Sequence, residues 1–284
     1  MDLTSIRRLV IVALFSDDQL LESLVLKGGN ALNIVHKVGS RSSIDIDLSI
    51  AEDFINLRDV ETRIFKSLKD RFDAAGYVIF DEIFEARPLE RREGLSEAWG
   101  GYSVEFKIID RPRFDRYKGD LSTLRRNAFP LAPNHSPKCK IEISKHEFVE
   151  PKEKAELDDF TIYVYSLPMI AVEKLRAICQ QMPEYKLRLR KTPRARDFYD
   201  IHAILSIKKI DLTSIENVRL INPIFEAKEV PIELINEVEQ TREFHRENWE
   251  EVLESVTGEE LREFDFYFDF VLAEIDKLKA LRII

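Results

Sequence analysis

Apolar and polar residues alternate in short runs through the first half of the chain, which is the pattern of half-buried β-strands. A short apolar run predicts a strand over residues 24–26, and the alternation predicts strands over residues 44–48, 77–85, 102–109, 138–144 and 160–165. Elsewhere in this half, apolar residues recur at helical spacing and predict helices over residues 1–15, 59–75 and 115–127. Gly76 follows the second of these helices and is expected to end it.

From Pro168 onward the apolar residues keep helical spacing alone. This spacing predicts helices over residues 169–181, 195–207, 231–238, 247–256 and 259–281. We therefore expect two domains, residues 1–165 with a mixed sheet flanked by helices and residues 166–284 with helices only. The fold class is α+β.

The stretch from Lys27 to Leu48 carries the strongest chemical pattern. Gly28 and Gly29 follow a predicted strand and precede a helix, where backbone N–H groups attract an anion. Glycine lets the backbone approach a phosphate closely, because it has no Cβ atom. Asn30 is expected to be the N-cap of that helix.

Asp45 and Asp47 alternate with Ile44, Ile46 and Leu48, so both acids lie on one face of a strand. Their Cα atoms are about 6.5–7 Å apart on that strand. Two carboxylates at this spacing can hold a divalent cation, Mg²⁺ or Mn²⁺, over a triphosphate. Alone, an Asp-x-Asp pair is usually an exposed polar face and a Gly-Gly pair a turn; their combination in this order favours a nucleotide site.

Composition excludes several classes of protein. The chain has 284 residues, 44% hydrophobic and 33% charged, and has no apolar run of the length that spans a membrane. The first sixteen residues fit an amphipathic helix better than a signal peptide. A net charge of -9 argues against general coating of nucleic acid but leaves room for one basic patch. Cys139 and Cys179 have no zinc-site spacing and are expected to be reduced thiols in the cytoplasm.

The residues from Gly28 to Asp47 resemble the motif of the AbiEii/AbiGii-type nucleotidyltransferase toxins, which include the MenT toxins. This family belongs to the polymerase-β-like nucleotidyltransferase superfamily, and its pattern is Gly-Gly-Thr-x-Leu followed by Arg-x-Ser-x-Asp-x-Asp. Here Asn30 stands where Thr or Ser is commoner. The resemblance implies a polymerase-β-like domain in which Asp45 and Asp47 bind the metal. It also implies that the nucleotide is bound by Lys27, Gly28, Gly29, Asn30, Arg41 and Ser43.

A third carboxylate completes the metal site in the superfamily. The resemblance assigns this place to Glu142, in the alternating run 140–144. Glu105, on the preceding predicted strand, is the alternative, and either could instead be a solvent-facing strand residue. The third carboxylate can also take the proton of the attacking hydroxyl.

Two further segments resemble the family. In Glu173-Lys174-Leu175-Arg176-Ala177, the resemblance implies that Lys174 is catalytic and binds the triphosphate; without it, Lys174 is an exposed helix lysine. In Arg196-Asp197-Phe198-Tyr199-Asp200, it implies that Asp197 is catalytic and either orients Lys174 or contacts the nucleotide. Asp200 is explained by its favourable place near a helix N-terminus.

Six cations lie within eleven residues just before Asp197. They form either an exposed loop or a contact to tRNA through its phosphates. The residues are Lys186, Arg188, Arg190, Lys191, Arg194 and Arg196.

The resemblance covers residues 20–207 and implies a metal-dependent toxin that transfers a nucleotide from an NTP to an acceptor hydroxyl, with the tRNA 3′ end as the acceptor. It also implies a separately encoded antitoxin as a partner. Two alternatives are a nucleotide-binding protein that acts through a partner without transfer, and a transferase that modifies a protein hydroxyl. The tail after Ile207 matches no motif and is expected to pack as helices.

Overall fold

The computed structural model describes residues 2–39, 45–89, 96, 99–131, 135–256, 258 and 260–284. By its internal contacts the chain divides into two compact units. The sheet unit contains Met1–Val35, Ser43–Glu93 and Gly100–Val164, and the helical unit contains His36–Ser42, Gly94–Trp99 and Tyr165–Ile284. The predicted boundary between residues 165 and 166 stays a prediction.

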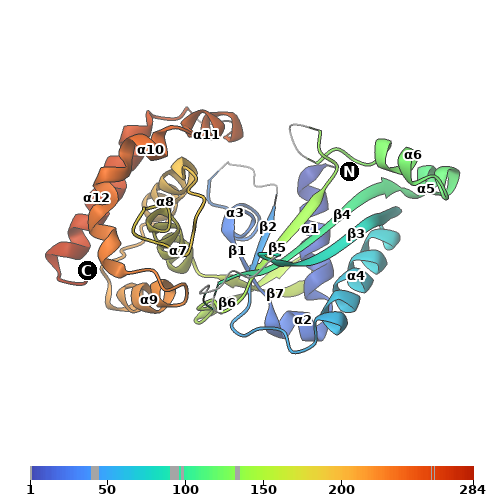
Figure 1. Ribbon diagram of the computed structural model, residues 1–284, viewed down its shortest axis with the longest axis horizontal. Helices are drawn as coiled ribbons and strands as arrows, with labels where there is room; N and C mark the ends of the chain where they lie inside the picture. Colours follow the sequence, from blue (N-terminus) through green and yellow to red (C-terminus); the bar gives the residue numbers. More distant parts are fainter. Residues whose placement is uncertain are drawn as a thin grey trace. The chain divides into compact units, whose positions relative to one another are not determined.

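The sheet unit is built on a seven-stranded mixed sheet in the order β3-β4-β5-β2-β1-β7-β6 (Figure 1). Strand β1 pairs with β7, and β2 with β5, in parallel, whereas β1–β2, β3–β4 and β4–β5 are antiparallel. The strands are β1 Val25–Lys27, β2 Ile46–Ser49, β3 Tyr77–Arg87, β4 Gly101–Asp110, β5 Cys139–Ser144, β6 Lys152–Leu157 and β7 Phe160–Tyr165.

All six predicted strands are present, and the predicted α+β class is confirmed. Strand β6 was not predicted, because four of the six residues in Lys-Glu-Lys-Ala-Glu-Leu are charged and its only buried residue is Leu157. It is the edge strand next to β7, where charged side chains are tolerated because one side of the strand has no partner.

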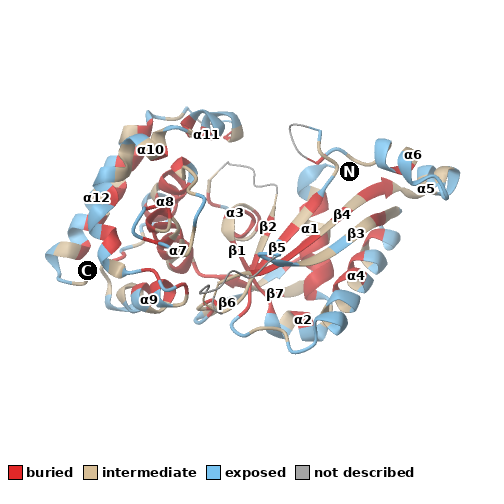
Figure 2. Cartoon of the chain, viewed as in Figure 1, coloured by how far each residue is buried: buried red, intermediate tan, exposed pale blue. Residues whose placement is uncertain are grey.

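One face of the sheet is apolar. Ile46 of β2 lies opposite Ile141 of β5, which in turn lies opposite Val104 of β4, and all three are fully buried. Helix α4 (Leu57–Ala74) covers this face, with the Phe72 ring 6.0 Å from the Phe106 ring of β4. Helix α1 (Leu3–Phe15) packs against α4, and the two helices turn buried stripes inward (Figure 2).

The other face of the same strands is polar. Residues that pair across a ladder point to the same side of a sheet. The pairings therefore put the side chains of Lys27 in β1, Asp47 in β2, Glu142 in β5 and Ser103 in β4 in one row across four strands. Strands β2, β4 and β5 are far apart in the sequence, so these side chains come together only in the folded sheet.

The predicted single helix over residues 115–127 is wrong. Two helices occupy this region, α5 (Arg111–Tyr117) and α6 (Leu121–Arg126), and Gly119 between them has φ +96°. A glycine with positive φ turns the chain out of the helix. Leu124 of α6 then packs with Phe80 and Ile109 of the sheet.

Asp81 fixes α6 to the sheet. It lies at a β-bulge in β3 with φ +58°, accepts a 2.8 Å hydrogen bond from Arg125 Nε in α6, and pairs with Lys107 of β4. The hydrogen bond from Arg125, with a smaller contribution from Lys107, lowers the pKa of Asp81 from 3.8 to about 2.

Stability should therefore depend on pH at Asp81. Its ionised form is stabilised in the folded state, so this contribution is complete above pH 4 and is lost as the pH falls toward 2. Asp81→Asn, which tolerates the positive φ, should lower the free energy of unfolding by about 1 kcal/mol at pH 7 and by less at pH 2. Urea unfolding of both proteins at several pH values measures this, and an equal difference at pH 7 and pH 2 would contradict it.

The helical unit contains α7 Leu167–Cys179, α8 Ala195–Ile207, α9 Ile215–Glu226, a 3-10 helix Ile232–Thr241, α10 Arg242–Arg246, α11 Trp249–Ser255 and α12 Phe264–Ala280 (Figure 1). Helix α8 has the predicted bounds. Helix α9 was not predicted and contains Pro223. Phe198 of α8 stacks on Phe268 of α12 with ring centroids 4.8 Å apart, and Arg242 and Arg246 of α10 both pair with Asp265 of α12 at 2.7 Å.

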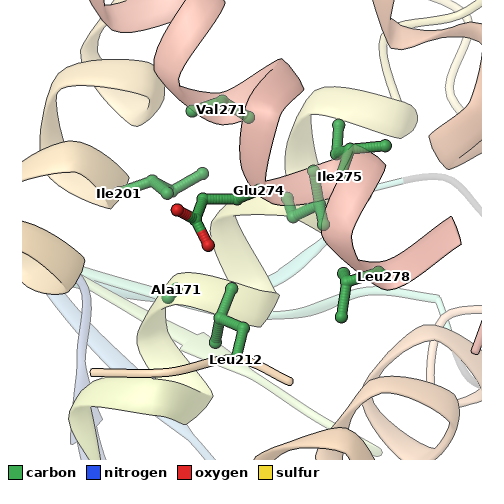
Figure 3. Close-up of a pocket in the computed structure, with 8 residues that line it drawn as sticks. Ala171, Ile201, Leu212, Val271, Glu274, Ile275 and Leu278 are labelled. Atoms are coloured by element: carbon green, nitrogen blue, oxygen red, sulfur yellow. The ribbon is translucent and has the colours of Figure 1, made fainter. Parts of the chain in front are cut away.

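A small cavity lies among α7, α8 and α12 (Figure 3). Its walls are apolar except for Glu274, and its volume of about 10 Å³ leaves room for at most one water molecule. It is a packing gap rather than a ligand site. Among the helices that the structure describes, none has the length and apolar character needed to cross a membrane.

Candidate nucleotide site

Gly28 forms the turn between β1 and the following helix. Helix α3 (Gly28–Asn30) starts directly after the strand and continues as a π-helical segment, Ala31–His36. Gly28 has φ +67°, and a Cβ atom there would lie only 2.3 Å from Asp47 Oδ2. The glycine therefore allows the Asp47 carboxylate to lie against the turn.

Asn30 has a different role from the predicted one. The N-cap of α3 is Lys27, so the expectation that Asn30 caps this helix is wrong. Asn30 is 1% exposed, and its Nδ2 donates a 2.6 Å hydrogen bond to the backbone oxygen of Asp45. Its Oδ1 accepts no hydrogen bond from any residue that the structure describes. Asn30 thus ties the glycine turn to the segment that leads into β2.

Replacing Gly28 with alanine should damage both the fold and the site. Alanine at positive φ costs about 1–2 kcal/mol, and its methyl group would displace the Asp47 carboxylate. We expect a lower melting temperature and a loss of transfer greater than that loss of stability explains. Gly76→Ala is the matched control, because Gly76 also has positive φ but nothing lies within 4 Å of its added Cβ. Equal activity in the two variants would contradict this prediction.

Asp47 and Glu142 occupy directly paired positions of β2 and β5, about 4.8 Å apart across the ladder. Glu142 forms an ion pair with Lys140, and its side chain is 48% exposed. Glu105 lies one row away, opposite Lys140, and pairs with Lys138 at 2.7 Å. Carboxylate oxygens are the donors that Mg²⁺ and Mn²⁺ prefer, so Asp47 and Glu142 fit such an ion by type.

No ready-made cluster of three or more metal-binding side chains occurs in the described part of the chain. Cys139 and Cys179 are free and buried, and burial raises the pKa of the Cys139 thiol to about 12, so that this thiol is protonated at neutral pH. Arg41 and Ser43, two of the predicted nucleotide-binding residues, lie outside the described residues.

Lys27 is held by a residue that the sequence analysis missed. Its Nζ lies 3.3 Å from Glu147 Oε1, and both side chains are nearly buried. Glu147 follows the end of β5, outside any periodic segment, so no pattern indicated it. A buried pair of this kind fixes the lysine next to Asp47, its register partner.

Lys174 lies in a buried cluster of charges within the helical unit. Its Nζ donates to Asp197 Oδ1 at 3.0 Å and to Asp200 Oδ2 at 2.7 Å, and Arg194 Nε donates to Asp197 Oδ2 at 2.5 Å. Burial would raise the pKa of Asp197, but Arg194, Lys174 and Arg196 outweigh it and hold that pKa far below 3.8. Among the described residues, Asp197 and Asp200 thus accept from two of the three Nζ donors of Lys174.

The six cations of the predicted tRNA contact differ in their surroundings. Lys191 donates to the backbone oxygens of Gln180 and Tyr185. Arg188 donates to the backbone oxygen of Arg190 and to the hydroxyl oxygen of Thr192. Lys186 donates to the Pro183 oxygen. Within the described residues, Arg190 and Arg196 make no side-chain hydrogen bond or ion pair, and both are exposed. Lys186, Arg188 and Lys191 therefore also stabilise the conformation of the loop through these hydrogen bonds.

The predicted site residues fall into two groups, one in each unit. The sheet unit brings together the Gly28 turn, Asp47 and Glu142, and the helical unit brings together Lys174 and Asp197.

The sequence matches one family model, described as "Nucleotidyl transferase AbiEii toxin, Type IV TA system", over residues 10–270. The chain belongs to the AbiEii family. It is therefore a nucleotidyltransferase and a toxin of the kind found in toxin–antitoxin systems, as the sequence motifs indicated. The AbiEii match also includes most of the tail after Ile207, where we recognised no motif.

No curated protein matches the chain. Two solved structures are similar to this AbiEii chain. One is an H. pylori protein named provisionally as a nucleotidyltransferase, with 15% identity, a TM-score of 0.44, and coverage of 96% of this chain and 95% of the other. The second is an antigenic nucleotidyltransferase-like protein from Paracoccidioides brasiliensis, with 13% identity, a TM-score of 0.39, and coverage of 81% and 91%.

Proposed function

We propose that this AbiEii protein transfers a nucleotide from an NTP to the 3′ end of tRNA in a reaction that depends on Mg²⁺ or Mn²⁺. The observation that carries the proposal is the Asp47 carboxylate against the Gly28 turn, in register with Glu142. The proposal is supported because carboxylate oxygens suit a divalent cation, and the start of a helix suits a phosphate.

Asp45, Asp47 and Glu142 would hold the cation, which when bound supplies positive charge to neutralise the triphosphate. Gly28 and Gly29 would donate backbone N–H groups to phosphate oxygens, with Lys27, Asn30, Arg41 and Ser43 around them. Glu142 is preferred over Glu105 because it is the register partner of Asp47.

Lys174 would donate its remaining N–H to the triphosphate, oriented by Asp197. The acceptor hydroxyl loses its proton to a carboxylate, and its oxygen bonds to the α-phosphorus. The bond from that phosphorus to the bridging oxygen breaks, and pyrophosphate leaves with the bond electrons.

The acceptor is assigned from the family resemblance together with the basic loop. Arg190 and Arg196 are exposed cations in an acidic protein, and phosphates are the partners that such side chains bind without regard to sequence. An antitoxin encoded alongside the toxin is the proposed protein partner.

The test is to incubate the purified protein with each α-labelled NTP, Mg²⁺ and total tRNA. Label on tRNA is the expected result. Label on a protein present in the reaction would instead support transfer to a protein hydroxyl. Binding of NTP without any transfer would support action through a partner, and either outcome would overturn the tRNA assignment.

A further inference from the structure

Helix α8 begins without a cap of its own. Its N-cap residue is Arg194, whose side chain makes no capping bond and is instead paired with Asp197. The first N–H groups of a helix have no acceptor within the helix and need one from elsewhere. This helix carries both Asp197 and Asp200, so the way its start is fixed bears directly on Lys174.

The tail supplies the missing acceptors. His245 Nδ1 accepts a 3.0 Å hydrogen bond from the Arg194 N–H, and Asn248 Oδ1 accepts one of 3.1 Å from the Ala195 N–H. Asn248 Nδ2 also donates to the Pro193 oxygen at 3.3 Å. Three consecutive residues at the start of α8 are therefore held by two side chains from around α10 and α11.

We propose that His245 and Asn248 are positioning residues for nucleotidyl transfer, which hold the start of α8 so that Asp197 meets Lys174. The proposal rests on the proposed role of Lys174 and Asp197 in binding the triphosphate. It assigns a function to the tail, which carried no recognisable motif.

Packing alone does not account for a histidine at position 245. The ring is fully buried and lies 5.2 Å from the Phe198 ring, where an apolar residue would pack well. Its Nε2 is buried without an acceptor among the described residues, which is unfavourable. What the histidine adds is the acceptor at Nδ1. Burial lowers the pKa of His245 to about 4, so the ring is neutral and Nδ1 stays an acceptor at neutral pH.

Asp197 lies in the first turn of α8, two residues after Ala195. A displacement of the helix start therefore moves its carboxylate directly. The Asp197–Lys174 contact of 3.0 Å and the Asp197–Arg194 contact of 2.5 Å leave little tolerance for such a shift. Misplacement of a catalytic group by about 1 Å can reduce a rate about 100-fold.

The experiment compares five variants of the full chain, the fifth being Lys174→Met, at a temperature at which all are folded. Asn248→Ala and His245→Phe remove the acceptors, and His245→Asn keeps an oxygen near the Nδ1 position. Ile275→Val is the stability control, because Ile275 lines the small cavity of Figure 3 rather than the start of α8. Two quantities are measured: kcat/KM for label transfer to total tRNA, and the Kd of an α,β-methylene NTP analogue with Mg²⁺.

We expect Asn248→Ala and His245→Phe to lower kcat/KM by about 10- to 100-fold and to weaken analogue binding, with His245→Asn restoring most of both. Ile275→Val should stay within about twofold of the unmodified chain. The proposal is overturned if the acceptor-deleting variants behave like Ile275→Val in both assays. Lys174→Met separates the two proposals: if it transfers and binds normally, the proposed function of Lys174 is wrong and this inference falls with it.

Discussion

Replacing Asp47 with asparagine is expected to lower nucleotidyl transfer by about 1000-fold while leaving the protein folded. Asparagine has the same shape and still fits against Gly28, but it cannot supply the negative charge that holds a divalent cation. A loss of this size corresponds to about 4 kcal/mol of transition-state stabilisation. The measurement is kcat/KM for label transfer, with thermal unfolding to confirm that the fold is intact.

The controls come from the same face of the sheet. Glu142→Gln should lower kcat/KM for label transfer nearly as much as Asp47→Asn does, because Glu142 is the register partner of Asp47. Glu105→Gln should keep nearly full activity, because Glu105 lies opposite Lys140 and pairs with Lys138. If Glu105→Gln is the more damaging of the two, the third carboxylate is Glu105. If Asp47→Asn transfers normally, the metal site is assigned wrongly.

Replacing Lys174 with methionine should lower both stability and activity. Methionine has a similar length but no charge, so Asp197 and Asp200 lose the ammonium they share. Removing one partner of a buried ion pair typically destabilises a protein by about 3–5 kcal/mol. We therefore expect a clear fall in the urea midpoint together with loss of transfer.

A second substitution separates the two effects. In Lys174→Met with Asp200→Asn, one uncompensated carboxylate is removed and Asp197 keeps Arg194 as a partner. This double variant should regain part of the lost stability but no transfer. Recovery of transfer along with stability would mean that Lys174 acts only in folding.

Local patterns were enough to predict most elements. Helix α8 has the predicted bounds because its apolar spacing is regular from Ala195 to Ile207. Helix α9 was not predicted because it contains Pro223, and proline usually ends a helix. Strand β6 was not predicted because most of its residues are charged. The β-bulge at Asp81 and the break at Gly119 depend on contacts and turns that no short-range period reveals.

The candidate site was less accessible to sequence reasoning. The alternation at Asp45 and Asp47 indicated a shared face, but the pairing of Asp47 with Glu142 depends on strands β2 and β5 meeting in one register. Without the family resemblance Lys174 was expected to be exposed, and it is buried because two acids of α8 neutralise it. Glu147, His245 and Asn248 act through partners 50 or more positions away, so no local motif could mark them.

The three hydrogen bonds between the tail and the start of α8 join residues 51, 53 and 55 positions apart. During synthesis the chain leaves the ribosome from its N-terminus, so Pro193, Arg194 and Ala195 emerge well before their hydrogen-bond partners His245 and Asn248. The full set of these hydrogen bonds can therefore form only after residue 248 has been synthesised. A nascent toxin chain that ends before residue 245 therefore has none of the hydrogen bonds by which the tail holds the start of α8.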